Sequence, residues 1–255
     1  MTAERRIPFA GITNFRDLGG YPTAGGGVTR WGIVFRADAL HKLTAADLQV
    51  FGELGVRTVF DLRSEVERDE FPNPVESLHV PIIGRANAAT APQRSPDMTF
   101  DDGETMLRDI YVGALQHSPL LVGTVLRGLA DPNRVPAVFH CHGGKDRTGV
   151  VAAVLLLALG VDRETVLDDY TETSRHRRVE HQQDSLANML ASGLSPEAAG
   201  AVLGTPRWAM AAAVDAIDDV YGGIDSFLTG AARLTADELS ALRTQLIEPG
   251  PTLPA

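Results

Sequence analysis

Short apolar runs alternate with amphipathic stretches over the first 160 residues of the chain, and amphipathic stretches alone follow. The runs at 56–62, 79–83 and 136–140 are rich in β-branched residues and have the length of strands. The run at 150–159 contains no breaker and ends at Gly160, which is typical of a buried helix with a glycine after its last turn. The pattern predicts an α/β fold: a mostly parallel central sheet flanked by helices, with a helical extension in the C-terminal half.

Helix starts are marked by a Ser or Thr placed three residues before an acidic residue, the signature of a capping box. The pairs are Thr44 with Asp47, Ser64 with Glu67, and Thr235 with Glu238. Residues 7–36 instead mix glycines with short β-type runs, and the cluster at 25–27 predicts a turn. We therefore expect a hairpin-like start, followed by alternating helices and strands.

Two stretches are expected to be lid-like or variable insertions in a single domain that spans residues 1–255. Residues 84–100 have no apolar period and contain two prolines, as long surface loops do. The second stretch covers about 170–205 and carries a basic cluster. This cluster, which is expected to form a solvated helix face, comprises Arg175, His176, Arg177 and Arg178.

Composition and charge narrow the class of protein. The formal net charge of −10 argues against nucleic-acid binding and means that an anionic substrate would need a local positive patch. No run of eighteen apolar residues is present, so no transmembrane segment is expected, and the N-terminus lacks the apolar core of a signal peptide. The single cysteine forbids an internal disulfide and suits a reducing compartment. We expect a cytoplasmic protein, with export without a cleaved signal left open.

The candidate chemistry lies in the loop between the strand at 136–140 and the helix that follows. Cys141, the only cysteine, stands six positions before Arg147, and Gly143 and Gly144 lie between them. Glycines let backbone N–H groups turn inward around an anion, and the N-terminus of the next helix adds positive potential. Such surroundings stabilise a thiolate, and an arginine fork binds two phosphate oxygens at once.

Two similar motifs do not fit this loop. A nucleotide-binding P-loop would need a glycine at Phe139 and a Ser or Thr at Asp146. A zinc site would need more ligands than the neighbours Cys141 and His142. We therefore expect no metal and no organic cofactor.

The string HCHGGKDRTG at 140–149 resembles the signature of the cysteine-dependent protein-tyrosine and dual-specificity phosphatases. It is most similar to their bacterial atypical group, which is typified by a mycobacterial enzyme. The segment NFRDLGG at 14–20 matches the N-terminal hallmark of that group, and 35–36 and 60–64 resemble its next blocks, in the same order. The C-terminal segment GGIDSFL is similar as well. The resemblance implies a cysteine-dependent phosphatase fold and a phosphatase activity.

The resemblance assigns roles to the residues of the loop. Cys141 would be the nucleophile, Arg147 would hold the phosphate oxygens, and Asp146 would protonate the leaving group. Two other acids stay open for that last role: Asp97 in the predicted loop, and Asp61, which is more readily expected to hold Lys145 or Arg147 in place. The residues expected to bind substrate are His142, Gly143, Gly144, Lys145, Thr148, Gly149 and Asp61.

Substrate and rival functions follow from the same loop. Phosphotyrosine is the first expected substrate, followed by phosphoserine or phosphothreonine and by phosphoinositides. The expected partners are therefore a phosphorylated protein or phospholipid as substrate, and inorganic phosphate as product or inhibitor. A sulfurtransferase or arsenate reductase also uses one cysteine in an anion-binding loop, but Arg147 and Thr148 disfavour both. A pseudophosphatase that only binds phosphate is disfavoured by the intact Cys141, Asp146 and Arg147. The oligomeric state is not indicated.

Overall fold

A five-stranded sheet lies at the centre of the computed structural model, which describes residues 4–82, 95–176 and 180–250. Its strands follow the order β1-β3-β6-β4-β5, and β3, β6, β4 and β5 run parallel while β1 is antiparallel to β3. The strands are β1 (Arg16–Asp17), β3 (Val34–Ala37), β4 (Thr58–Asp61), β5 (Leu78–His79) and β6 (Ala137–His140). The prediction of a mostly parallel sheet is confirmed.

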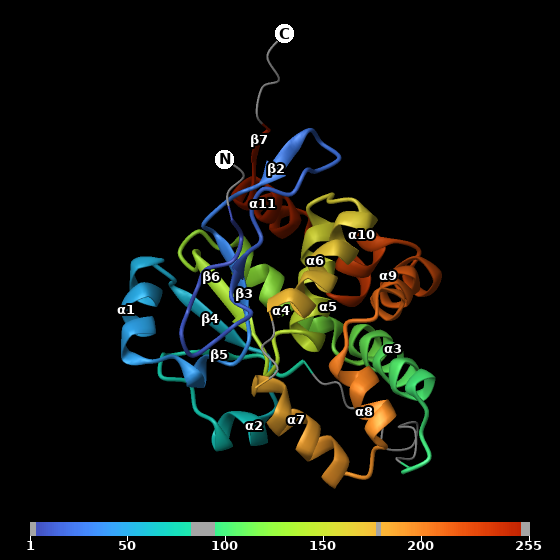
Figure 1. Ribbon diagram of the computed structural model, residues 1–255. Helices are drawn as coiled ribbons and strands as arrows, with labels where there is room; N and C mark the ends of the chain where they lie inside the picture. Colours follow the sequence, from blue (N-terminus) through green and yellow to red (C-terminus); the bar gives the residue numbers. More distant parts are fainter. Residues whose placement is uncertain (1–3, 83–94, 177–179, 251–255) are drawn as a thin grey trace.

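Both faces of the sheet are covered by helices, as expected for parallel strands (Figure 1). Alternate residues point to opposite faces. Val59 and Val138 pack with Phe35 in the cluster on the side of α1 (Ala45–Glu53), which is completed by aromatic residues of the N-terminal segment. Phe60 and Phe139 face the larger cluster on the other side, where α4 (Pro119–Ala130) and α5 (Asp146–Ala158) lie. Helix α5 is apolar on nearly all sides because the sheet and further helices surround it.

In the part of the chain that the structure describes, two of the other helices precede α5, and the rest make up an extensive helical C-terminal half. These helices are α2 (Glu65–Glu70), α3 (Phe100–His117), α6 (Arg163–His176), α7 (Glu180–Ala191), α8 (Pro196–Leu203), α9 (Arg207–Tyr221) and α11 (Ala236–Leu246). Short helical turns are η1 (Leu40–Lys42), α10 (Ile224–Ser226) and η2 (Phe227–Ala231). The three predicted capping boxes are present, at Thr44, Ser64 and Thr235. The predicted helical extension is therefore confirmed.

The expected hairpin-like start is confirmed in part, because the chain turns at the glycines 25–27 and Pro22 pairs antiparallel with Val28 across that turn. Strand β2 (Gly27–Thr29) pairs antiparallel with β7 (Ile247–Pro249), at the other end of the chain, in a separate two-stranded sheet. Residues 7–12 form no strand; their apolar side chains contribute to the cluster beside α1. The runs that form β2 and β3 are extended, as the sequence predicts, but local sequence does not specify a partner more than two hundred residues away.

The two expected insertions are described only in part. Most of 84–100 lies outside the described residues, and α3 begins at Phe100, within the predicted loop. Arg177 and Arg178 of the basic cluster also lie outside the described residues. Arg175 is exposed and pairs with Glu172 one turn earlier, as a solvated helix face would. No helix in the described ranges is long and apolar enough to cross a membrane.

Candidate active site

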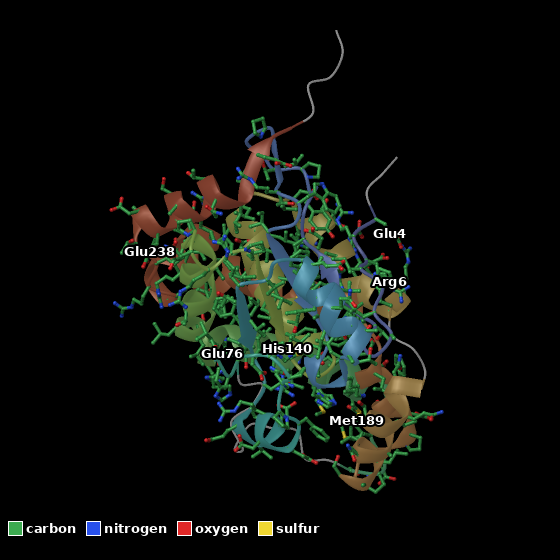
Figure 2. The ribbon with its side chains drawn as sticks, turned by 90° about the vertical axis from the view of Figure 1, so that its left-hand side faces the viewer. Glu4, Arg6, Glu76, His140, Met189 and Glu238 are labelled. Atoms are coloured by element: carbon green, nitrogen blue, oxygen red, sulfur yellow. The ribbon has the colours of Figure 1, made fainter. Side chains whose placement is uncertain are left out.

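The loop that carries Cys141 begins where the central strand β6 ends. His140 is the last residue of β6 and pairs in register with Asp61 of β4 and Ala37 of β3, so the carboxyl ends of three strands meet beside the loop. In parallel sheets this edge is where active sites collect. Figure 2 shows His140 at the end of the sheet that faces α2, with Met189 of α7 at the same end of the molecule.

Backbone contacts fix the path of the loop. The N–H of Ala39 donates to the His142 carbonyl at 3.0 Å, and the N–H of Leu62 donates to the His140 carbonyl at 2.8 Å. Gly144 has φ +62°, and a Cβ atom there would lie 2.6 Å from the Ala37 carbonyl oxygen. Only glycine fits this position without strain. The N-cap of α5, Lys145, makes no side-chain capping bond, so no side-chain cap occupies the N-terminal N–H groups of that helix.

A buried polar layer from the N-terminal block supports the loop from outside. Asn14 donates from Nδ2 to the Gly144 carbonyl at 3.0 Å, and Arg36 donates to the same oxygen at 2.9 Å. Arg16 and Arg36 both pair with Asp169 of α6. Burial raises the pKa of Asp169, but the two arginines outweigh it and bring this pKa to about 2. Residues of the N-terminal part of the chain thus support the loop structurally.

Arg147 is held by a residue that the sequence did not single out for this role. Its Nη1 and Nη2 donate to Oε2 and Oε1 of Glu67 at 2.6 and 2.7 Å. Glu67 Oε2 also accepts from the Ser64 N–H in the capping box of α2. Burial alone would raise the pKa of Glu67, but the Arg147 hydrogen bonds and charge lower it to about 2. The sequence signal that could have pointed to Glu67 is the capping box of α2, because its acidic residue binds both Ser64 and Arg147.

The surroundings of Arg147 stabilise its positive charge. Burial lowers the pKa of Arg147, yet the hydrogen bonds that it donates to Glu67 and the negative charges of Cys141, Glu67 and Asp146 raise it above its ordinary value. Two of the five N–H groups of the guanidinium go to Glu67, and an arginine then retains three for another acceptor. Cys141 is buried, with 2% of its surface exposed, and is a free thiol.

Asp146 lies at the first position of α5, with its side chain 34% exposed. Its Oδ1 accepts from the Tyr111 hydroxyl at 2.6 Å and lies 3.1 Å from Lys145 Nζ. Lys145 is buried and also donates to the carbonyls of Val202 and Gly204 at 2.6 and 2.7 Å. Asp146 is therefore beside the loop, partly open to solvent and anchored by a buried tyrosine from α3.

Asp61 does not hold Lys145 or Arg147, and that expectation is wrong. Its carboxylate is fully buried and accepts from Arg63 at 2.9 and 2.6 Å, while Asn73 adds a further donor at 3.1 Å. Burial raises the pKa of Asp61, but the Arg63 hydrogen bonds lower it overall. Asp61 is thus a structural anion beneath the loop, with neither the exposure for binding substrate nor a proton to donate.

His140 and Asn73 complete this network. Asn73 Nδ2 lies 3.0 Å from His140 Nε2, and His140 Nδ1 lies 3.1 Å from the Cys141 carbonyl oxygen. Burial lowers the pKa of His140 to about 4, against the raising effect of Asp61. A neutral imidazole with its proton on Nδ1 satisfies both contacts, so His140 shapes the loop rather than acting as a base.

Asp97, the competing acid, lies on the surface just before α3. Its side chain is exposed, and its N–H donates to Ser95 Oγ at 3.2 Å in a turn. Met98, the next residue, packs into the small cluster with Leu194 of the α7–α8 connection and residues of α8. Within the described ranges we find no contact between Asp97 and the residues of the loop.

The other expected substrate-binding residues lie on the loop or in the first turn of α5. The His142 ring lies with His41 and Phe71 in an aromatic cluster, at ring-centroid separations of 6.0 Å from each. Burial is the main cause that lowers the pKa of His142. The Thr148 hydroxyl is buried and makes no hydrogen bond with any described residue. Gly149 allows close packing of Tyr170, 3.1 Å from where a Cβ would stand.

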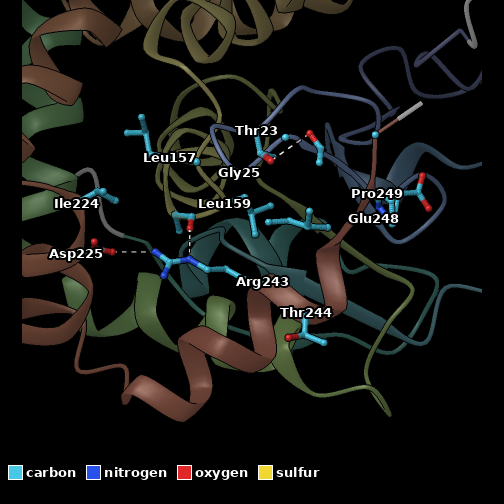
Figure 3. Close-up of a pocket in the computed structure, with 16 residues that line it drawn as sticks. Thr23, Gly25, Leu157, Leu159, Ile224, Asp225, Arg243, Thr244, Glu248 and Pro249 are labelled. Carbon is cyan, nitrogen blue, oxygen red and sulfur yellow. Dashed lines mark hydrogen bonds and ion pairs between the residues drawn. The ribbon is translucent and has the colours of Figure 1, made fainter. Parts of the chain in front are cut away.

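A larger groove, of about 1030 Å³, lies away from the loop (Figure 3). It is formed by the end of α5, the glycine turn at 25–27 and α11. Its arginine, Arg243, is occupied by the Ala158 carbonyl at 2.9 Å and by Asp225 at 2.9 Å. No residue of the Cys141 loop lines this groove, so the size of a cavity does not identify the site here. In the described part of the chain, no group of three or more His, Cys, Asp or Glu side chains could hold a metal ion.

Comparison with known proteins agrees with this geometry. Residues 7–248 match the tyrosine phosphatase family. A candidate tyrosine-protein phosphatase of Cupriavidus necator is 30% identical over 249 residues, covering 91% of this chain and 86% of that protein. The triple specificity protein phosphatase PtpB of Mycobacterium tuberculosis is 27% identical, covering 90% of this chain and 94% of that protein.

Among solved structures, the crystal structure of TpbA from P. aeruginosa aligns with 70% of this chain and with 89% of the TpbA chain. The overlap has 17% sequence identity and a TM-score of 0.31, which is too low to support an argument. The family match, in contrast, runs through every block of the site, from Asn14 to the last helix. The chain belongs to the tyrosine phosphatase family.

Proposed function

We propose that this phosphatase hydrolyses phosphate monoesters through a phosphocysteine intermediate formed on Cys141, with phosphotyrosine as its first substrate. One arrangement carries the proposal: Cys141, Asp146 and Arg147 follow directly from the end of β6 into the first turn of α5, where Glu67 holds the Arg147 guanidinium by two hydrogen bonds. The nucleophile, the acid and the phosphate clamp therefore share one loop and the first turn of α5.

The first chemical step is a displacement at phosphorus. A lone pair on the Cys141 sulfur forms the S–P bond while the bond from phosphorus to the leaving oxygen breaks. Arg147 and the N–H groups at the start of α5 hold the other phosphate oxygens and balance their charge. Asp146 gives its proton to the leaving oxygen, so the alcohol or phenol departs neutral.

The second step returns the enzyme to its starting state. A water molecule attacks phosphorus and loses a proton to the Asp146 carboxylate, and the S–P bond breaks. Inorganic phosphate and the thiolate of Cys141 are the products, and Asp146 is protonated again. The balance needs water alone beside the substrate and no oxidant, metal or organic cofactor.

The substrate class follows from the relatives as well as from the site. The mycobacterial relative is named as a triple specificity phosphatase, and this is our reason to include phosphoserine or phosphothreonine peptides and phosphoinositides. We propose that the chain acts as one domain, since the family match spans residues 7–248, and that it works in the cytoplasm, where a single reactive thiol remains reduced.

The test is a Cys141→Ser variant, assayed on a phosphotyrosine peptide and titrated with inorganic phosphate. Hydrolysis should fall by roughly 10⁴-fold or more, as expected when the nucleophile is removed, while phosphate binding persists. Residual turnover near that of the wild type would refute the assignment. Asp146→Asn should reduce hydrolysis of phosphotyrosine by about 10²-fold or more and that of p-nitrophenyl phosphate by less, because the latter's leaving group needs less protonation.

A further inference from the structure

The hydroxyl of Tyr111 occupies an unusual place in the interior. Tyr111 lies on α3, is completely buried, and packs within the main hydrophobic cluster. A phenylalanine would fill almost the same space without placing a polar atom in the interior. A buried hydroxyl costs free energy unless it is hydrogen-bonded. The Tyr111 hydroxyl makes two such contacts, 2.6 Å to Asp146 Oδ1 and 2.7 Å to the Tyr170 hydroxyl of α6.

The chemistry of these groups fixes the direction of the hydrogen bonds. An ionised carboxylate only accepts, so Tyr111 gives its single proton to Asp146 and accepts from Tyr170. Burial and the neighbouring charge of Asp146 both raise the pKa of Tyr111 well above its ordinary value. Tyr111 therefore remains a proton donor over the whole range in which the enzyme would work.

Lys145 supplies a second donor to the same oxygen. Its ammonium lies 3.1 Å from Asp146 Oδ1 and is itself fixed by the carbonyls of Val202 and Gly204 at the end of α8. Helix α8 is in turn packed closely on α3, where a Cβ at Gly103 would lie 2.5 Å from the Ala198 carbonyl. Asp146 Oδ1 is thus bound by two groups, one on α3 and one anchored at the end of α8.

We propose that Tyr111 is a positioning residue for proton transfer by Asp146: by binding Oδ1 it turns Oδ2, the oxygen that carries the transferred proton, toward the leaving group. The inference rests on the proposed function, in which Asp146 is the acid. A small rotation of a carboxyl about its bond moves Oδ2 by a large fraction of an ångström, and a displacement of about 1 Å can cost up to about 10²-fold in rate. The hydroxyls of Tyr111 and Tyr170 thereby connect α3 and α6 to the Asp146 carboxylate.

The test compares Tyr111→Phe with Tyr221→Phe, which removes another hydroxyl that bonds to α3, at the Leu115 carbonyl, away from the loop. For Tyr111→Phe, kcat on a phosphotyrosine peptide should fall by about tenfold, and kcat on p-nitrophenyl phosphate by less than about twofold, with KM unchanged on both. Tyr221→Phe should leave both rates within about twofold of the wild type. Equal losses on the two substrates, or none, would overturn the inference.

Two further measurements separate a positioning role from a structural one. In an Asp146→Asn background, Tyr111→Phe should have less than about a twofold additional effect, because both changes act through one group. Binding of inorganic phosphate to Tyr111→Phe should match the wild type. If the variant bound phosphate more than about threefold more weakly, Tyr111 would be a residue that supports the loop structure, and the inference would be overturned.

Failure of the proposed function gives a different result from failure of this inference. If Asp146→Asn reduces both substrates equally, Asp146 is not the acid, and the proposed function must be revised first. If Asp146→Asn is selective for phosphotyrosine while Tyr111→Phe is not, the acid assignment survives and the inference about Tyr111 alone is wrong.

Discussion

Arg147 and Glu67 are joined by two parallel hydrogen bonds, at 2.6 and 2.7 Å, although they stand eighty positions apart in the chain. Such a bidentate pair fixes the plane of a guanidinium as well as its place. Helix α2 itself is held against the sheet by Arg63, which donates to the Phe71 carbonyl at 2.7 Å. The orientation of the expected phosphate clamp therefore depends on a short, solvent-facing helix.

Glu67→Gln should weaken this clamp without unfolding α2. Glutamine is accepted at the third position of a capping box, so the cap at Ser64 is retained and only the charged pair is lost. We expect kcat/KM on phosphotyrosine to fall by about tenfold and the free energy of unfolding by about 1–3 kcal/mol. The control is Glu65→Gln, an exposed change in the same first turn. Equal kinetics for the two variants would show that Glu67 does not orient Arg147.

Gly144→Ala should destroy the loop, because the residue has φ +62° and its Cβ would approach the Ala37 carbonyl to 2.6 Å. The left-handed conformation alone costs an L-residue about 1–2 kcal/mol, and the backbone contact adds to it. We expect turnover to fall by about 10²-fold or more. In Gly52→Ala, within α1, the new Cβ meets no atom within 4 Å, and this variant should gain about 0.5–1 kcal/mol of stability. Calorimetric unfolding together with turnover tests both expectations.

The central sheet and the catalytic loop could be predicted because their signals are local. The runs that became β4 and β6 each have a Val-Phe pair at their centre, and β6 is covered on both faces. Cys141, Asp146 and Arg147 lie within one short segment, so their proximity needed no knowledge of the fold. The resemblance to a known family supplied Asp146, which residue chemistry alone left in competition with Asp97 and Asp61.

The partners that the sequence did not reveal all come from other elements. Glu67 had a sufficient local explanation as a capping residue, and Tyr111 reads as an ordinary apolar position of an amphipathic helix. Asp61 lies at the sheet edge beside the loop, but its carboxylate pairs with Arg63, two positions later, and not with Lys145 or Arg147. A pattern along the chain shows which face is buried, but it does not show which of several charged groups will pair across elements.

Acidification should destabilise the protein through His140. Burial brings the folded-state pKa of His140 to about 4, below its ordinary value of 6.5. Between pH 6.5 and 4 the unfolded chain therefore binds the proton more readily than the folded one, so stability present above pH 6.5 is lost as the pH falls. The loss from this one group is on the order of 3 kcal/mol. Urea unfolding at several pH values checks it: the curve for His140→Asn should be flatter than that of the wild type in this window, and parallel curves would contradict the assignment.

Lys145→Met should reduce activity on all substrates alike. The sequence predicts a substrate-binding role for Lys145, but its ammonium is buried and contacts Asp146 and the carbonyls of Val202 and Gly204, so it joins the loop to α8. Removing it takes the ammonium donor away from two partly buried carbonyls and loosens Asp146. We expect turnover of a phosphotyrosine peptide and of a phosphoinositide to fall by the same factor, within about twofold.

The matched control for Lys145 is Lys42→Met. Lys42 lines the small cavity beside His142 and Gly143, so the variant removes the same charge from the neighbourhood of the loop while the contacts of Asp146 and α8 remain. If Lys145 acts by anchoring, Lys42→Met should cost much less turnover of the phosphotyrosine peptide than Lys145→Met does. A loss in Lys145→Met confined to the phosphoinositide would instead show that its ammonium turns toward the substrate, because an anchor shared by every reaction cannot distinguish one phosphate ester from another.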